Sequence, residues 1–177
     1  GTGATDQNLL EAALNAFNGA LSLNRELDVA WLGLARTQRM LGTLETAAES
    51  LSRAQRLSDD KDPSIACESA LLALDHGDLQ AALLHVDAAE VHGQNATTAY
   101  IRGNISAVKG KLKQALYHYS DCLTLDGSHI RARLNRSSVY MGLDDARKAL
   151  DDAETLLDLA PQLAVGRVRK GDAHMHL

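Results

Sequence analysis

Aromatic residues are scarce in this chain of 177 residues: they make up 3% of it, whereas apolar residues make up 45%. Alanine and leucine therefore have to fill most of the core, and small alanines allow helices to approach each other closely. The chain also lacks a run of about eighteen apolar residues, the length needed to cross a bilayer, and it shows no signal peptide. These absences predict a soluble, all-α protein without membrane insertion.

Cysteine is rarer still, with two residues. Cys67 and Cys122 lie in different segments, without CxxC spacing or matched histidines, so no metal site is expected. Both are interpreted as small buried residues, in preference to a disulfide or a nucleophile. A reducing compartment is favoured, and we predict a cytoplasmic location, with the lumen of the endoplasmic reticulum as the open alternative.

A basic stripe is missing as well. The net charge is −5, and residues of both signs are interleaved along the chain, which predicts no nucleic-acid partner. Glycine-rich phosphate loops, nucleophile elbows and metal-ligand clusters are absent, so we expect neither a cofactor nor an enzymatic activity. The carboxylates at Asp144, Asp145, Asp151 and Asp152 are interpreted as helix caps and exposed helix faces.

Internal repetition is the strongest positive signal. The segments "GTLETAA", "GDLQAAL" and "GKLKQAL" begin at Gly42, Gly77 and Gly110, which are 35 and then 33 residues apart. A fourth copy, "LDDARKAL", begins at Leu143 and has Asp144 in place of the glycine. Each copy lies between two stretches of roughly thirteen residues with apolar residues at helical spacing. The pattern predicts repeated pairs of helices.

These features resemble the tetratricopeptide repeat (TPR) family, whose 34-residue unit is a pair of antiparallel helices. The resemblance implies an all-α, right-handed α-solenoid of helix-turn-helix repeats. It also implies one array over residues 1–177, in a fragment of a longer chain. The expected units are a partial repeat over 1–27, complete repeats over 28–62, 63–95, 96–129 and 130–163, and a partial repeat over 164–177. The first complete repeat matches the family pattern at Trp31, Leu34, Gly42, Ala47, Leu51 and Ala54.

Two sets of positions in the first helix of each repeat indicate how the helices pack and where a ligand would bind. At position eight the residue is small, because the two helices of a repeat cross closely there. Positions two, five, six, nine and twelve are expected to line a concave groove, the usual binding surface of such solenoids. The small residues are Ala35, Ala70, Gly103, Ser137 and Gly171, and the expected groove residues include Arg36, Arg39, Glu68, Tyr100, Asn104, Arg131, Asn135, Ser138 and Arg169.

The last two and a half repeats resemble the carboxylate-clamp TPR domains of co-chaperones, which grip the acidic C-terminal tails of heat-shock chaperones. The segments that carry this resemblance are "RGNISAVKGKLKQALYHYSDCLTLD", "LNRSSVYMGL" and "RVRKGDAHMHL". Of the five clamp positions, the two asparagines correspond to Asn104 and Asn135 and the arginine to Arg169, while the two lysine positions hold Tyr100 and Val165. Arg169 is then the only cation of the set, helped by Arg131 and Arg136 nearby, and a weak clamp is expected.

We therefore predict a protein–protein interaction scaffold that binds a partner peptide or helix in its groove, with co-chaperone-like binding of an acidic chaperone tail as its most specific form. The peptide-binding residues would be Tyr100, Asn104, Arg131, Asn135, Ser138 and Arg169. Three alternatives stay open. In the first, the asparagines satisfy only local groups while Arg169 is solvated. In the second, the clamp residues reflect ancestry without binding of a tail. In the third, the array is a structural or regulatory arm of a larger assembly or enzyme.

Overall fold

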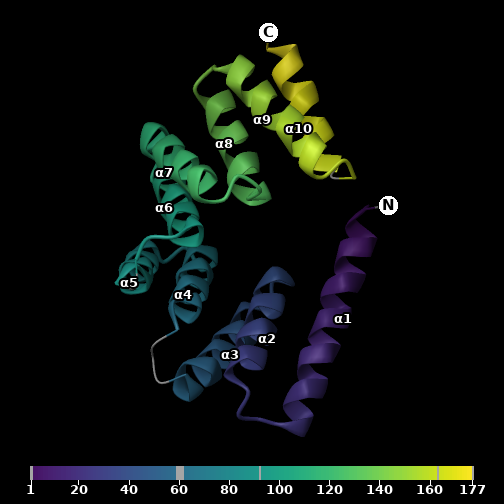
Figure 1. Cartoon of the computed structure of the whole chain (residues 1–177), viewed down its shortest axis with the longest axis vertical. Coiled ribbons are helices and arrows are strands. Elements are labelled where there is room, and N and C mark those ends of the chain that lie inside the picture. The colour runs from purple at the N-terminus through teal and green to yellow at the C-terminus, as the bar shows by residue number, and fades with distance from the viewer. Residues whose placement is uncertain (1, 59–61, 92, 163, 177) are drawn as a thin grey trace. The chain divides into compact units, whose positions relative to one another are not determined.

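Helices account for all the regular secondary structure that the computed structural model describes, over residues 2–58, 62–91, 93–162 and 164–176 (Figure 1). Within these ranges there are ten helices and no strand. No helix among the described residues is long and apolar enough to cross a bilayer. The helices are α1 (Thr2–Leu23), α2 (Asp28–Met40), α3 (Leu44–Leu57), α4 (Pro63–Asp75), α5 (Leu79–Glu90), α6 (Ala96–Val108), α7 (Leu112–Leu125), α8 (Ile130–Gly142), α9 (Ala146–Leu159) and α10 (Ala164–Met175).

The helices alternate between two roles. The first helices α2, α4, α6, α8 and α10 begin at the residues where the sequence repeats start, and each of the second helices α3, α5, α7 and α9 begins shortly after a first helix ends. Connections this short place consecutive helices side by side and antiparallel. The predicted all-α class, built from helix-turn-helix repeats, is confirmed.

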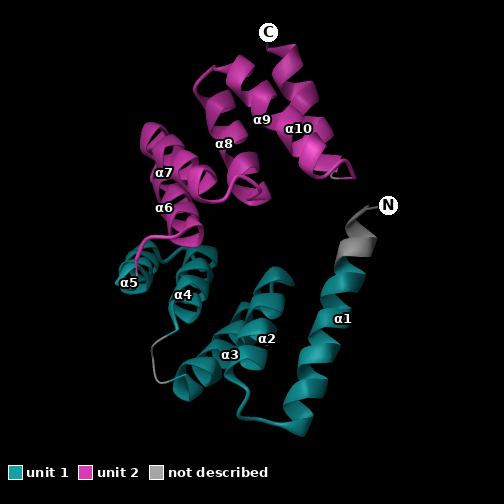
Figure 2. Cartoon of the chain, in the orientation of Figure 1, with its two compact units in different colours: residues 1–92 teal, residues 93–177 magenta. Residues whose placement is uncertain are grey.

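The chain forms two compact units, residues 1–92 and residues 93–177 (Figure 2). Within each unit, a first helix packs against the second helix of its own repeat and the second helix that precedes it. First helices also contact one another: α2 contacts α4 in unit 1, while α8 contacts α6 and α10 in unit 2. Among the described residues, neighbouring second helices make no comparable contact. Each unit is therefore packed more tightly on its first-helix side, which becomes its inner face.

The small residue at position eight behaves as predicted in the four complete repeats, where it is buried. Gly103 is the tightest case, because a Cβ atom added there would overlap the ring of Tyr119 on α7. In the first complete repeat, Ala35 and Leu51 occupy the positions of Gly103 and Tyr119. A residue larger than glycine there faces a residue smaller than tyrosine. The prediction is wrong for Gly171: it is exposed, and no described atom lies within 4 Å of a Cβ built there, because no described helix crosses α10 at that point.

Buried and mostly small side chains fill the centre of every repeat. Position twenty holds an alanine throughout, and position twenty-seven holds an alanine, cysteine or leucine, all at most 1% exposed. Cys67 and Cys122 are free and buried, which confirms their interpretation as small core residues. Burial raises the pKa of each thiol to about 11, so both stay protonated at neutral pH. The alanine positions are Ala47, Ala82, Ala115 and Ala149, and the last positions are Ala54, Ala89, Cys122 and Leu156.

The turn inside each repeat requires one residue with left-handed backbone geometry. Gly42, Gly77 and Gly110 adopt φ of 80°, 78° and 70° there, and Asp144 adopts φ of 58°. Glycine takes this conformation without a steric penalty, whereas an L-residue is strained by roughly 1–2 kcal/mol. The fourth repeat therefore keeps the turn of the other three at some cost in stability.

The carboxylates of the fourth repeat have two different roles. Asp145 caps α9, since its side chain accepts a hydrogen bond from the backbone N–H of Lys148 at 3.3 Å. The interpretation as a cap is confirmed for this residue. Asp152 was interpreted as part of an exposed helix face, and this is wrong: it is only 3% exposed, because it lies on the side of α9 that packs against α8.

Candidate functional site

Two asparagines from adjacent repeats meet in unit 2. The amide nitrogen Nδ2 of Asn135, on α8, donates a hydrogen bond to Oδ1 of Asn104, on α6, at 3.0 Å. The hydroxyl of Tyr119, on α7, donates to the same oxygen at 2.9 Å. Both asparagines are half-buried, and Tyr119 is 1% exposed. These three side chains, from three successive helices, form what we call the amide cluster.

The cluster has a fixed hydrogen-bonding polarity. Burial raises the pKa of Tyr119 to about 12, so the phenol stays protonated at neutral pH and acts as a donor. Because Oδ1 of Asn104 accepts both bonds, the orientation of its amide is set. The amide nitrogen of Asn104 has no hydrogen bond to any described residue. Its N–H groups can therefore serve a carbonyl or carboxylate oxygen of a ligand.

Aromatic rings border the cluster. The ring centroid of Tyr100 lies 4.9 Å from that of His129 and 6.2 Å from that of Tyr119. His129 is itself fixed, because its Nδ1 accepts a hydrogen bond from the backbone N–H of Ala132 and so caps α8. One of the two clamp-lysine positions is thus occupied by a ring packed among rings. This edge of the site is apolar where the clamp resemblance would place a cation.

Ser138 and Arg169 make polar contacts within their own helices. Arg169 is on α10, where its Nη1 is 3.7 Å from Oδ2 of Asp172, one turn along the same helix. Ser138 donates its hydroxyl to the backbone oxygen of Leu134, and Arg131 is exposed in the first turn of α8. Among the described residues, no hydrogen bond or ion pair links Arg169 with either asparagine. The structure brings together two of the three matched clamp residues.

Arg136, which the sequence offered as an additional cation, is engaged elsewhere. It forms a two-point ion pair with Asp152, with Nε–Oδ2 at 2.9 Å and Nη2–Oδ1 at 2.7 Å, and its Nη1 donates to Ser120 on α7. Arg133 adds a third contact to the same carboxylate at 3.3 Å. The hydrogen bonds of Asp152 raise the pKa of Arg136, although burial opposes them. Arg136 therefore holds α7, α8 and α9 together and is not available to a ligand.

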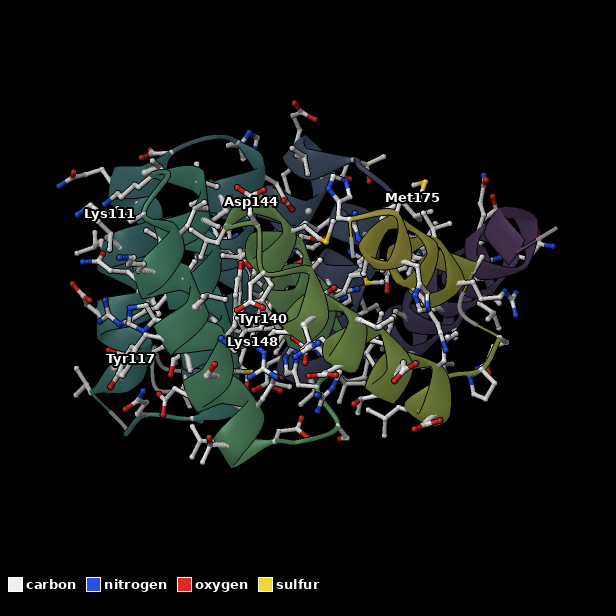
Figure 3. All side chains as sticks on the ribbon, turned by 90° about the horizontal axis from the view of Figure 1, so that it is seen from above. Lys111, Tyr117, Tyr140, Asp144, Lys148 and Met175 are labelled. Atoms are coloured by element: carbon white, nitrogen blue, oxygen red, sulfur yellow. The ribbon has the colours of Figure 1, made fainter. Side chains whose placement is uncertain are left out.

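Tyr140 lies beside this ion pair. The guanidinium carbon of Arg136 is 5.8 Å from its ring centroid, and the ammonium of Lys148, on α9, is 5.5 Å from it. Figure 3 shows Tyr140 and Lys148 next to each other. Cations at this distance from an aromatic ring are attracted by its electron-rich face. The contact adds a second link between α8 and α9.

Unit 1 has a charge network at the matching place on its inner face. Glu68, on α4, is 2% exposed. Its carboxylate accepts hydrogen bonds from two arginines of α2, from Nε of Arg36 at 3.1 Å and from Nε of Arg39 at 2.5 Å. Arg39 also pairs with Asp75 at 2.9 Å. Burial lowers the pKa of Arg39, but the bonds and charges of Glu68 and Asp75 outweigh it and raise the pKa overall. The prediction that Glu68 lines an open groove is wrong, because its carboxylate is enclosed by two arginines.

The two networks share one geometrical relation. Position nine of a first helix meets position six of the next first helix: Arg36 meets Glu68 in unit 1, and Asn104 meets Asn135 in unit 2. The sequence predicted that both positions line the same groove. It did not indicate that Tyr119 would complete the cluster, because a tyrosine fifteen residues after Asn104 matches the pattern simply as a packing aromatic. Opposite charges at positions nine and six were the signal that could have revealed the Arg36–Glu68 pair.

Sequence comparison finds a relative over part of the chain. The chain is 33% identical over 82 residues to the Hsp70-Hsp90 organizing protein of Triticum aestivum. The match covers 46% of this chain and 14% of the wheat protein, so the chain spans only a small part of its relative. No protein-family model matches the sequence.

Structural comparison covers nearly the whole chain. A thermophilic TPR protein of Thermus thermophilus superimposes with a TM-score of 0.83 at 22% identity, over 98% of this chain and 95% of that protein. YrrB, a TPR protein with an unusual peptide-binding site, gives a TM-score of 0.59 at 20% identity, over 94% of this chain and 86% of that protein. At such identities the shared property is the fold.

Proposed function

Since the chain has the α-solenoid fold of tetratricopeptide repeat proteins, we propose that it is a protein–protein interaction scaffold. Its ligand is an extended peptide or a helix of a partner protein, bound against the first helices of unit 2. Arrays of this kind present the first helices of successive repeats as one extended surface. A peptide that crosses several helices contacts one or two side chains from each of them.

The observation that carries the proposal is the hydrogen bond between Asn104 and Asn135. It joins the first helices of two adjacent repeats, and the hydroxyl of Tyr119 donates a second hydrogen bond to the same oxygen of Asn104. Two half-buried amides in fixed orientation, with N–H groups left over, are suited to hold the backbone carbonyls or the terminal carboxylate of a peptide. The side chains bordering them, Tyr100 and His129, suit an apolar residue of the same peptide.

In its more specific form, the proposal is that the peptide is the acidic C-terminal tail of a heat-shock chaperone. The similarity to the Hsp70-Hsp90 organizing protein and the match at Asn104, Asn135 and Arg169 support this form. Two features support the expectation that such binding would be weak. Asp172 stands 3.7 Å from Arg169, and the two lysine positions hold Tyr100 and Val165. We expect a dissociation constant of about 10–100 µM, strongly weakened by salt.

The test is a calorimetric titration of the full chain with a peptide ending in Glu-Glu-Val-Asp. We expect Asn135→Ala to weaken binding by about threefold to tenfold, because one neutral hydrogen bond and the orientation of Asn104 are lost. Arg169→Ala should weaken it by about tenfold, because a charge-assisted bond is stronger. Arg147→Ala is the matched control: Arg147 is an exposed helical arginine outside the site, and its loss should leave the affinity unchanged.

A restored clamp separates the general proposal from the specific one. Tyr100→Lys combined with Val165→Lys supplies the two missing cations, and the affinity for the acidic tail should rise by about tenfold or more. Thermal unfolding of each variant shows whether it is folded. If the restored variant binds no better than the wild type, the chaperone-tail form is wrong. If a library of extended peptides shows no binding that depends on Asn135, the scaffold proposal for this face is also wrong, and the alternative of a structural arm is favoured.

A further inference from the structure

Two hollows adjoin on the second-helix side of unit 1, away from the first-helix face. One has a volume of about 410 Å³ and is lined by Arg25, Glu26, Trp31, Arg53, Arg56 and Leu57. The other has a volume of about 510 Å³ and shares Trp31, Arg53 and Arg56 with the first. We call the two together the Trp31 pocket.

The helices explain why a hollow lies here. In unit 1, α1 and α3 both pack against α2 but do not contact each other as α2 and α4 do, so the side chains between them leave space. Trp31, in the first turn of α2, forms part of the wall between the hollows. Its ring is half-buried and held in place, because Nε1 donates to the backbone oxygen of Arg25 at 2.8 Å and the ring packs on the cluster of Leu21, Ala30 and Leu34.

The charges of the Trp31 pocket are unusual for this chain. The lining of its two hollows contains three arginines and two glutamates, a net charge of +1, in a protein of net charge −5. Arg53 and Arg56 are three residues apart on α3 and share one face of that helix, while Arg25 lies in the turn before α2. None of the three guanidinium groups forms a hydrogen bond or ion pair with a described residue, in contrast to Arg39 and Arg136.

Unpaired guanidinium groups around an aromatic wall match a specific ligand chemistry. Guanidinium groups bind carboxylates with two parallel hydrogen bonds, and indole rings pack against flat or branched apolar groups. The aliphatic parts of Arg53 and Arg56, together with Leu57, extend the apolar wall beside Trp31. A carboxylate next to a bulky apolar group satisfies both halves of the pocket.

The length and charge of the pocket indicate which kind of molecule carries the carboxylate and the apolar group. Lining residues run along α3 from Thr46 to Leu57, about 16 Å at the helical rise, which an extended peptide spans with about five residues. We propose that the Trp31 pocket is a second binding site, for an acidic peptide segment that places a bulky apolar side chain between carboxylates. This site goes beyond the first-helix face in unit 2.

The sequence provides a direct reporter of the site. Trp31 is the only tryptophan of the chain, so its fluorescence reports this pocket selectively. The full chain is titrated with the probe peptide acetyl-Asp-Asp-Phe-Asp-Asp-amide, which contains no tryptophan. We expect a saturable change in emission and a fall in affinity as salt is raised. Arg53→Gln and Arg56→Gln should each weaken binding by about tenfold, because a charge-assisted bond to the peptide is lost.

Matched controls locate the binding. Arg147→Gln changes an exposed arginine of α9, in the other unit, and Asn135→Ala changes the amide cluster; neither should alter the affinity for the probe. The three arginines exchanged are exposed and form no hydrogen bond or ion pair with a described residue. The arginine variants should therefore unfold at the wild-type temperature.

Peptide and small-molecule arms decide between occupants. The probe with alanine in place of phenylalanine, or with asparagines in place of the aspartates, should bind at least about tenfold more weakly, because each lacks half of the recognised group. Phenylpropionate alone should also bind more weakly, because it fills only one hollow. Absence of a fluorescence change, equal binding of the alanine peptide, or affinities unaffected by Arg53→Gln and Arg56→Gln would each overturn the proposal. Tighter binding of phenylpropionate than of the peptide would do the same, and would identify a small-molecule site.

Discussion

Replacing Gly103 with alanine tests how closely the two helices of the third repeat pack. The added Cβ atom would overlap ring atoms of Tyr119. Tyr119 cannot easily move aside, because it is 1% exposed and its hydroxyl is bonded to Asn104. Either the ring leaves its preferred rotamer or α6 and α7 separate. Both responses disturb the amide cluster as well as the core.

The expected magnitude combines two opposing effects. Inserting a methyl group into a close-packed core costs roughly 1–3 kcal/mol. Alanine favours a helix over glycine by about 1 kcal/mol. We therefore expect Gly103→Ala to lower the free energy of unfolding by about 1–2 kcal/mol. Gly171 occupies the same position of its repeat but is exposed, with open space around it. Gly171→Ala should then raise the free energy by about 0.5–1 kcal/mol, through helix propensity alone.

Urea unfolding followed by circular dichroism measures both variants against the wild type. A third variant, Gly103→Ala with Tyr119→Leu, copies the pair Ala35 and Leu51 of the first repeat and should recover most of the stability lost to overlap. Titration of the Glu-Glu-Val-Asp peptide adds a functional measurement, since displacing Tyr119 should weaken binding through Asn104. If Gly103→Ala proves as stable as the wild type, the helices are less tightly packed at position eight than we infer.

Two other predictions concern the turn of the fourth repeat and the buried charge of unit 1. Asp144→Gly should stabilise the protein by about 0.5–1 kcal/mol, because glycine adopts the φ of 58° without strain, and an unchanged melting temperature would contradict this. Glu68→Gln should destabilise it by about 2 kcal/mol, less than the loss of a fully buried pair, because Arg39 keeps Asp75 and Arg36 is half exposed. Urea unfolding of Glu68→Gln beside Glu45→Gln, an exposed glutamate of α3, checks the second prediction, and equal stability of the two variants would refute it.

Much of the fold could be predicted from the sequence because its determinants are local. The step of about 34 residues between Gly42, Gly77 and Gly110 indicates where each turn lies, and apolar spacing indicates the helices on either side. Asp144 in the glycine position was consistent with the same turn, as its left-handed backbone shows. The small residues at position eight, and the meeting of positions nine and six that joins Asn104 with Asn135, follow from the same register.

The partners of charged and polar side chains were decided by the tertiary structure. Asp152 and Glu68 have the sequence surroundings of exposed residues, yet both are buried against arginines of neighbouring helices. Tyr119 reaches Asn104, and Trp31 comes to lie beside Arg53, only once the helices are packed. A helical repeat determines which face of its own helix a residue occupies. Whether that face meets a neighbour or solvent depends on the distance and crossing of helices that lie far apart in the chain, and a single sequence carries no direct record of it.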